Sequence, residues 1–234
     1  MKRILSLVLA ALMLLTCISA MASCSSEEPQ TEAKTEEKTE NKGGDVLLYA
    51  GIGVIALAAA REYFTIDDIL QEAADRGEAP LIVICDELSD PHNLGAILRT
   101  AEAAGAHGVI VPRRRAAGLT STVYKASAGA VEYVPVARVA NITETLKDLK
   151  KRGIWVYGLD MDGDPWCRTD LTDAMALVVG SEGRGVSRLV KEQCDFVLSL
   201  PMAGQINSLN ASVACGIVLY EAARQRQGIK AIQK

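Results

Sequence analysis

Short apolar runs alternate with helical patterns along the chain from Pro80 onward. The run Leu81 to Cys85 predicts a buried strand, and the helical spacing of apolar residues that follows it ends at Gly105. Further strands are predicted at Val109 to Val111, Tyr133 to Val136, Ile154 to Leu159, Met175 to Val179 and Phe196 to Leu200. Strands that alternate with helices predict an α/β fold: a mostly parallel sheet with helices on both faces and ligands at the carboxyl ends of its strands.

Two further helices are predicted from the residues that begin them. Asn141 and Glu144 are spaced as a capping box, for a helix that ends near Gly153. Ser208 or Asn210 can cap the last helix of the chain. The apolar stripe of this last helix is predicted to run through Val213, Ile217 and Tyr220.

The amino-terminal part of the chain has a different pattern. Lys2 and Arg3 precede the apolar run Ile4 to Leu15, and small residues then lead to Cys24, so residues 1–24 are predicted to be a lipoprotein-like signal segment. Residues 25–44 are rich in Glu, Thr and Lys without periodicity, which predicts a disordered linker. The apolar segment Val46 to Ala60 is short for a membrane span, and a buried strand-to-helix piece and a membrane contact both fit it.

Composition narrows the class of protein. The 234 residues allow one domain of good size with appendages, and 49% hydrophobic residues suffice for a buried core. The net charge of -4 provides no general basic field, so any RNA binding must use local patches. The six cysteines form no C-x-x-C pair and the two histidines are not grouped with them, so no metal site is expected. Three of these cysteines are predicted to be buried as small apolar side chains, at Cys85, Cys194 and Cys215.

Three loops at predicted strand ends have unusual compositions. The first, DELSDPHNLGAILRT, contains Asn93, which can cap the following helix, and Arg99, which lies off the apolar stripe or pairs with Glu102. The second is GSEGRG at 180–185, whose glycines allow close backbone approach but fit neither a Rossmann fingerprint nor a P-loop. The third is the segment from Leu200, where Asn and Ser side chains precede a helix.

Together, the segments DPHNLGAILRTAEAAG, VVGSEGRGVSRL and LPMAGQINSLNASVACGIVLYEAARQR resemble the three motifs of the SpoU-type (TrmH-like) RNA ribose 2'-O-methyltransferases of the SPOUT superfamily. The resemblance runs from about Gly53 to Gln227 and is greatest to enzymes that methylate a guanosine of 23S ribosomal RNA. It implies a deep C-terminal trefoil knot, S-adenosylmethionine as cofactor, RNA as substrate and a homodimer. Transfer RNA enzymes are the near neighbours, so tRNA is the alternative substrate.

The same resemblance assigns residues to roles. The cofactor would be held, largely through backbone groups, by Gly180, Leu200, Met202, Gly204 and Leu209. The catalytic or substrate-positioning places fall on Asn93, Arg99, Glu182, Ser208 and Asn210.

Chemical reasoning refines two of these roles. A guanidinium is effectively always protonated, so Arg99 is expected to hold phosphate or to stabilise the developing alkoxide rather than to act as a base. Glu182 would then orient Arg99 or accept a proton, although a carboxylate near a helix start can also serve only to stabilise a turn. Asn93 and Asn210 would supply neutral hydrogen bonds to the ribose or to loop backbone.

Residues outside the motifs are candidates for RNA contacts. Arg113, Arg114 and Arg115 follow the second strand and either track RNA phosphates or lie in a solvated loop. Trp155 and Trp166 could stack on bases, but the apolar strand around Trp155 favours a place in the core. A solvated helix face is predicted for Lys147, Lys150, Lys151 and Arg152.

The chain departs from the family at its amino-terminal side. Residues 45–79 resemble a remnant of an RNA-binding domain and its connector, residues 80–228 the methyltransferase domain, and residues 229–234 a tail. S-adenosylmethionine and ribosome precursors are cytoplasmic, so the catalytic domain is expected in the cytoplasm and residues 1–44 are interpreted as a fusion or a mispredicted reading frame. If the leader functions, the alternatives are a membrane-anchored protein and a tethered, non-catalytic module that binds RNA or cofactor.

Overall fold

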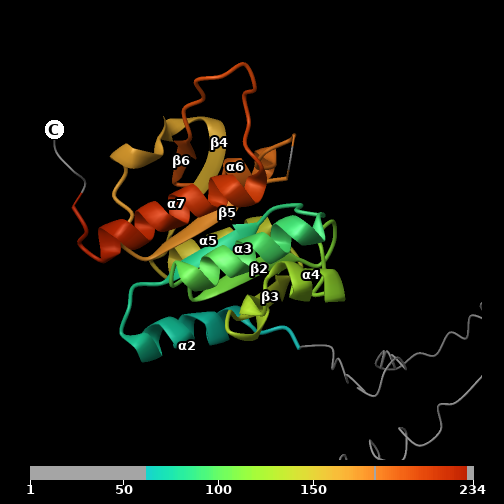
Figure 1. The fold of residues 1–234 in the computed structure, drawn as a ribbon. Helices are drawn as coiled ribbons and strands as arrows, with labels where there is room; N and C mark the ends of the chain where they lie inside the picture. Colours follow the sequence, from blue (N-terminus) through green and yellow to red (C-terminus); the bar gives the residue numbers. More distant parts are fainter. Residues whose placement is uncertain (1–61, 182, 231–234) are drawn as a thin grey trace, which may run out of the picture. The chain divides into compact units, whose positions relative to one another are not determined.

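The computed structural model describes residues 62–181 and 183–230, which form one parallel sheet with helices on both faces (Figure 1). The predicted leader, the linker and residues 45–61 of the RNA-binding remnant lie outside the described residues, as does Glu182. The strands are β1 (Leu81–Cys85), β2 (Gly108–Pro112), β3 (Val136–Val139), β4 (Trp155–Pro165), β5 (Met175–Val179) and β6 (Phe196–Ser199). All neighbouring strands pair in parallel in the order β3-β2-β1-β5-β4-β6, which confirms the predicted α/β fold.

Alternate residues of the central strand β1 pack on opposite faces of the sheet. Leu81, Val83 and Cys85 belong to the core beneath α3 and α7, which lie side by side in Figure 1. Ile82 and Ile84 belong to the core on the other face. Because both faces are covered, the strand is apolar throughout, as parallel strands generally are. The helices are α2 (Ile66–Arg76), α3 (Pro91–Ala103), α4 (Ser121–Ala126), α5 (Ile142–Lys151), α6 (Arg188–Lys191) and α7 (Ala211–Arg226).

The helix caps confirm part of the prediction. Asn141 accepts a hydrogen bond from the Glu144 backbone at the start of α5, and Asn210 caps α7 through the backbone of Ser212 and Val213. Asn93 does not cap α3, because Asp90 accepts from the first-turn N–H groups and places Asn93 inside the helix, where it is buried. The knot that the family resemblance implies stays a prediction.

Two predictions were wrong: the residue at which β3 begins and the face of α7 that is buried. β3 begins at Val136 rather than Tyr133, because a 3-10 turn (Ala130–Glu132) precedes it and Pro135 has no N–H to donate to the sheet. The predicted stripe of α7 faces outward, since Val213 is 50% and Tyr220 55% exposed. The face of α7 that packs in the core consists of smaller or differently spaced residues, among them Ala211, Cys215, Val218, Leu219 and Ala222.

Other single-residue predictions had mixed outcomes. Cys85 and Cys215 are fully buried, and Cys194 is partly buried. Trp155 is not core-filling: its side chain is 47% exposed and contacts Phe196 with ring centroids 5.7 Å apart. The cationic face of α5 is exposed but ion-paired, for example Lys150 with Asp195 at 2.8 Å. None of the helices formed by the described residues is long and apolar enough to cross a membrane.

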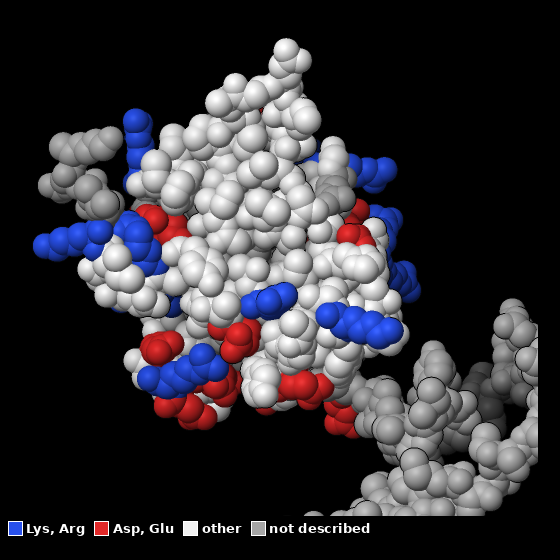
Figure 2. All heavy atoms as spheres, in the orientation of Figure 1, with Lys and Arg blue, Asp and Glu red and all other residues white. Residues whose placement is uncertain are grey.

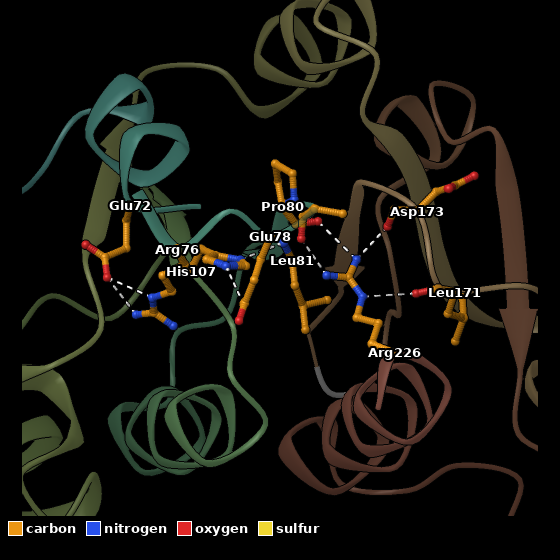
Figure 3. Close-up of polar contacts among 10 residues, drawn as sticks. Glu72, Arg76, Glu78, Pro80, Leu81, His107, Leu171, Asp173 and Arg226 are labelled. Carbon is orange, nitrogen blue, oxygen red and sulfur yellow. Dashed lines mark hydrogen bonds and ion pairs between the residues drawn. The ribbon is translucent and has the colours of Figure 1, made fainter. Parts of the chain in front are cut away.

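A dense polar network closes the edge of the sheet where β1 and β5 begin (Figure 3). The guanidinium of Arg226, at the end of α7, donates hydrogen bonds to the carbonyl oxygens of Ala79, Pro80, Leu171 and Asp173. The buried ring of His107 accepts from the backbone N–H of Leu81 at 3.0 Å and lies 3.1 Å from the Glu78 carboxylate. These bonds hold α7 and the connections into β1 and β5 in fixed positions.

Candidate functional site

The second and third motif segments meet over a cavity of about 270 Å³ beside the middle of β4 and the carboxyl ends of β5 and β6. Of the residues predicted to hold the cofactor, Gly180, Leu200, Met202 and Leu209 line this cavity. Gly204 is exposed and is not part of the lining. Ser208, predicted to act on the substrate, lines the cavity as well. The lining is completed mainly by small and aliphatic side chains such as Val179, Ala211 and Ala214.

The glycine loop after β5 folds tightly on itself at one wall of the cavity. The N–H of Gly185 donates to the carbonyl of Ser181 at 3.0 Å, and a Cβ at Gly180 would lie 2.0 Å from the carbonyl group of Gly185. Gly183 and Gly185 have φ angles of 81° and 65°, which favour glycine. Close packing and left-handed backbone therefore explain why this loop is rich in glycine.

The loop is anchored to β1 by the buried carboxylate of Asp86. This side chain is 4% exposed and accepts a hydrogen bond from the backbone N–H of Ser187 at 2.8 Å. The N–H of Asp86 in turn donates to the carbonyl of Val179 at 2.8 Å. Asp86 therefore holds both the start and the end of the loop against the sheet.

The first and third motif segments are joined by a hydrogen bond between two asparagines. The side-chain amide of Asn210 donates to the Asn93 oxygen at 2.8 Å, and its own oxygen accepts from Ser212 and Val213 at the start of α7. Asn93 is only 5% exposed, so its amide orientation is fixed by neighbours rather than by water. The structure thus brings together two of the predicted catalytic residues, which are 117 positions apart in the sequence.

Arg99 lies exposed on α3. The predicted alternative, an ion pair with Glu102, is not found among the ion pairs of residues 62–181 and 183–230. Within the same described range, no hydrogen bond holds the Arg99 guanidinium. An exposed guanidinium without a protein partner can bind an anion from solution.

Residues 201–210 form a fully exposed loop between β6 and α7, the projection at the top of Figure 1. This loop contains no Lys, Arg, Asp or Glu, and Figure 2 shows the projection without charge. Its apolar side chains are unusually exposed, with Met202 at 37%, Ile206 at 76% and Leu209 at 42%. Exposed apolar side chains gathered in one loop favour contact with a ligand or a partner.

The predicted RNA-binding arginines follow β2, at the same edge of the sheet as the cavity. Arg113, Arg114 and Arg115 are all exposed, but Arg115 pairs with Glu87 at 2.7 Å. Both partners of that pair have positive φ angles, 58° for Arg115 and 54° for Glu87. Trp155 begins β4 and so lies at the opposite edge from the cavity, whereas Trp166 packs against the core under α3 and α7.

Sequence reasoning missed the contribution of β4 to the cavity. This strand bulges between Leu159 and Asp164, and the bulge places Asp160 and Met161 in the cavity lining. Asp160 accepts from the N–H of Met161 at 2.7 Å and pairs with Lys191 of α6 at 3.3 Å. Burial opposes the charge of Lys191, but its hydrogen bonds and proximity to Asp160 and Asp162 outweigh burial and raise its pKa. The signal for a bulge was Gly163 within the polar run DMDGDP.

The buried thiols are not suited to nucleophilic chemistry. Burial, reinforced by the charge of Asp86, raises the pKa of Cys85 to about 12, and burial also raises the pKa of Cys215. Both thiols therefore stay protonated near neutral pH. Among the described residues, no three His, Cys, Asp or Glu side chains are grouped as metal ligands would be. The chemistry available at the site is that of amides, hydroxyls, carboxylates and guanidinium groups.

Comparison with known proteins identifies a family model and relatives that this chain matches. The model of the SpoU rRNA Methylase family matches residues 80–220. The Bacillus subtilis protein YacO, whose name assigns it to the TrmH family of tRNA/rRNA methyltransferases, is 54% identical over 178 residues, which cover 76% of this chain and 72% of YacO.

Two solved structures are similar in fold and sequence. The SpoU methyltransferase AviRb from Streptomyces viridochromogenes, solved in complex with AdoMet, matches with a TM-score of 0.61 and 36% identity. That match covers 64% of this chain and 62% of AviRb. An RNA 2'-O ribose methyltransferase matches with a TM-score of 0.58 and 29% identity over 73% of this chain and 61% of that chain. The present chain thus spans less than two thirds of either solved chain.

Proposed function

The chain belongs to the SpoU rRNA methylase family of S-adenosylmethionine-dependent RNA methyltransferases, and we propose that it methylates a ribose 2'-hydroxyl of RNA. The observation that carries the proposal is the hydrogen bond from Asn210 to Asn93. It joins the first motif segment to the third at the start of α7, whose first residue, Ala211, lines the cavity between the second and third segments. The printed name of one similar structure, an RNA 2'-O ribose methyltransferase, supports the choice of hydroxyl.

The residues that line the cavity are chemically suited to bind S-adenosylmethionine. Leu200 and Leu209 offer apolar surface for an aromatic base, and the glycine loop forms a tightly packed wall in which a side chain at Gly180 would collide with the backbone of Gly185. Met202 adds adaptable apolar surface at the mouth. When bound, the cofactor supplies an electrophilic methyl group on its sulfonium. The task left for the protein is to align the ribose hydroxyl and to assist the loss of its proton.

The catalytic roles follow from what each group can donate or accept. Asn93 and Asn210 form a rigid neutral pair that can orient the ribose, and Ser208 can donate to it from the cavity lining. Arg99, exposed and unpaired among the described residues, would hold an RNA phosphate or stabilise the developing alkoxide. Glu182, outside the described residues, is assigned the role of orienting Arg99 or accepting the proton on the basis of its motif position alone.

The proposed substrate is a guanosine of 23S ribosomal RNA, with tRNA as the alternative. The name of YacO covers both kinds of RNA. Arg113, Arg114 and Arg115 lie at the cavity edge of the sheet and would contact RNA phosphates. Because the salt dependence of RNA binding scales with the number of phosphates that the protein neutralises, contacts from these three arginines should make binding weaken only gradually as salt rises.

We further propose that the protein is a homodimer and that its catalytic domain works in the cytoplasm. The exposed Val213 and Tyr220 of α7, together with Leu209 in the loop before it, provide an apolar surface that a second copy would cover. Light scattering of the purified protein measures its mass in solution and should find a dimer. Tyr220→Glu should convert that dimer into a monomer. The cytoplasmic location is proposed because cofactor and ribosome precursors are found there.

The experiment that tests the function uses the full chain with S-adenosylmethionine labelled in its methyl group. Unmodified 23S rRNA and unmodified tRNA transcripts are offered separately, and label in RNA is counted after removal of free cofactor. Transfer to 23S rRNA supports the proposal, and transfer to tRNA alone selects the alternative substrate. Cofactor binding without transfer to either RNA would favour the non-catalytic module. Mapping ribose methylation in cells with and without the gene then identifies the nucleotide.

A further inference from the structure

The bulge in β4 places the carboxylate of Asp160 in the lining of the cavity. Asp160 follows directly on the last regularly paired residue of β4, Leu159, and its side chain is 14% exposed. The bulge is closed by β6, since Ser199 donates a hydrogen bond to the carbonyl of Gly163 at 2.7 Å. A side chain at Gly163 would collide with the backbone of Val197 at 2.4 Å. Bulges beside ligand sites commonly serve to aim one side chain.

Asp160 is held in one orientation by two donors. The N–H of Met161 binds one carboxylate oxygen at 2.7 Å, and the ammonium of Lys191 lies 3.3 Å from the other. On the cavity side, the Asp160 carboxylate lies 3.3 Å from the position that a Cβ at Gly185 would occupy, so it abuts the glycine loop. The carboxylate thus sits between β4, α6 and the loop that forms one wall of the cavity.

The charge balance of the cavity indicates what this carboxylate recognises. Among the described residues of the lining, Asp160 and Arg184 are the charged side chains. Lys191 already lies beside Asp160, although it is shared with the exposed Asp162, so Asp160 is better placed to accept hydrogen bonds than to bind a cation. A carboxylate has about four lone-pair positions, and the two donors named above leave the others for a ligand. Acidic side chains just beyond a strand end hold ribose hydroxyls in this way in dinucleotide-binding sheets.

We propose that Asp160 binds the ribose hydroxyls of the cofactor and is a specificity-determining residue of the cavity. The inference rests on the proposed function, because it takes S-adenosylmethionine as the ligand. It assigns Lys191 to positioning Asp160 and the β4 bulge to presenting it. S-adenosylmethionine and S-adenosylhomocysteine share the ribose, so the contact contributes equally to binding of cofactor and product.

The test measures binding of S-adenosylhomocysteine and of its 2'-deoxy and 3'-deoxy analogues to the full chain by isothermal titration calorimetry. Asp160→Ala should weaken S-adenosylhomocysteine about 10- to 100-fold, the range for a hydrogen bond to a charged group. Asp162→Asn is the matched control, because Asp162 also pairs with Lys191 but is 83% exposed and outside the cavity lining. This variant should bind S-adenosylhomocysteine with the affinity of the wild type. Asp160→Asn, which keeps one acceptor oxygen, should bind with intermediate affinity and provides a second variant if the alanine protein does not fold.

The deoxy analogues identify the contact itself. The wild type should bind at least one of them more weakly than S-adenosylhomocysteine, whereas Asp160→Ala should bind that analogue and the parent equally, because the interacting group is already gone. An undiminished penalty for the missing hydroxyl in Asp160→Ala, or wild-type affinity in both Asp160 variants, would overturn the assignment while leaving the proposed function intact. Failure of the wild type to bind S-adenosylhomocysteine at all would overturn both.

Discussion

The two edges of the sheet are built for different tasks. At the edge where β1 and β5 begin, one guanidinium, that of Arg226, donates to four backbone carbonyls, and the His107 ring is fully buried (Figure 3). At the edge where the strands end, the glycine loop folds on itself and residues 201–210 are exposed. Polar contacts thus stabilise the fold at the edge where β1 and β5 begin, whereas the edge where the strands end leaves backbone and apolar surface available to ligands.

The largest effect is expected from Arg99→Ala on α3, the helix that begins at the open edge. Loss of a group that stabilises charge in the transition state should lower methyl transfer at least about 100-fold. Cofactor affinity should stay nearly unchanged, because Arg99 is not part of the cavity lining. Single-turnover transfer and calorimetric binding measure the two quantities separately. Lys147→Ala on α5, across the sheet, is the charge-matched control, and an equal loss of binding and transfer in Arg99→Ala would show that its role is misassigned.

A glycine substitution separates the cavity wall from the exposed loop beside it. Gly180→Ala places a Cβ 2.0 Å from the backbone of Gly185, and such overpacking costs about 1 to 3 kcal/mol. The distorted loop should weaken S-adenosylmethionine about 10-fold or more. Gly204→Ala is the comparison, since its Cβ would meet nothing within 4 Å. Calorimetry should find wild-type affinity in Gly204→Ala, and equal affinities in the two variants would remove the glycine loop from the binding site.

At the closed edge, the expected loss is in stability rather than in catalysis. Arg226→Met removes hydrogen bonds to four carbonyl oxygens, of which only that of Pro80 keeps another donor among the described residues, the N–H of Met175, and should lower the free energy of unfolding by about 2 to 4 kcal/mol. Arg188→Met removes only an exposed pair with Glu192 and should cost about 0.5 kcal/mol or less. Denaturant titration measures both, and the transfer rate per folded Arg226→Met molecule should match the wild type. A lower rate in fully folded protein would mean that the two edges are coupled.

A smaller effect at the same edge depends on pH. Burial, with the nearby charge of Arg76, lowers the pKa of His107 from 6.5, although Glu78 opposes the shift. The unfolded chain therefore binds the proton more readily than the native protein, so the stability given by the neutral ring is present above pH 6.5 and is lost as the pH falls below it. Unfolding measured from about pH 7.5 to about pH 5.5 should show a shallower loss in His107→Gln than in the wild type. Identical slopes would place the pH dependence in other groups.

The sequence predicted the elements whose burial is uniform. β1 and β5 lie at their predicted residues, because a strand covered on both faces is a continuous apolar run that its polar neighbours delimit. The face of α7 was mispredicted because large apolar residues were taken as core. In the structure, small residues allow α7 to approach α3, where a Cβ at Gly216 would touch Thr100 at 3.4 Å, while Tyr220 faces outward. Which face of a helix is buried depends on the elements that pack against it, and the apolar pattern of the helix alone does not identify them.

In the candidate site, residues next to regular elements were easier to predict than residues on irregular backbone. Three residues that the motif resemblance assigns to the cofactor, Gly180, Leu200 and Leu209, line the cavity, and each lies within two residues of a regular element. Asp160 was missed, since the bulge that presents it arises from pairing with β6 and not from local pattern. Gly204 was assigned to the cofactor by motif position but lies outside the lining. Residues presented by irregular backbone could be found only in the structure.

The most direct test of the central claim is to locate the transferred methyl group. The full chain is incubated with S-adenosylmethionine and unmodified 23S rRNA, the RNA is digested to nucleosides, and the methylated product is identified by mass spectrometry. A site that orients a ribose hydroxyl with the Asn93 and Asn210 pair predicts a 2'-O-methylated nucleoside, which is 2'-O-methylguanosine for the proposed substrate and is absent when Arg99→Ala replaces the wild type. A methyl group on a base, or no methylated nucleoside from protein that binds the cofactor, would contradict the account.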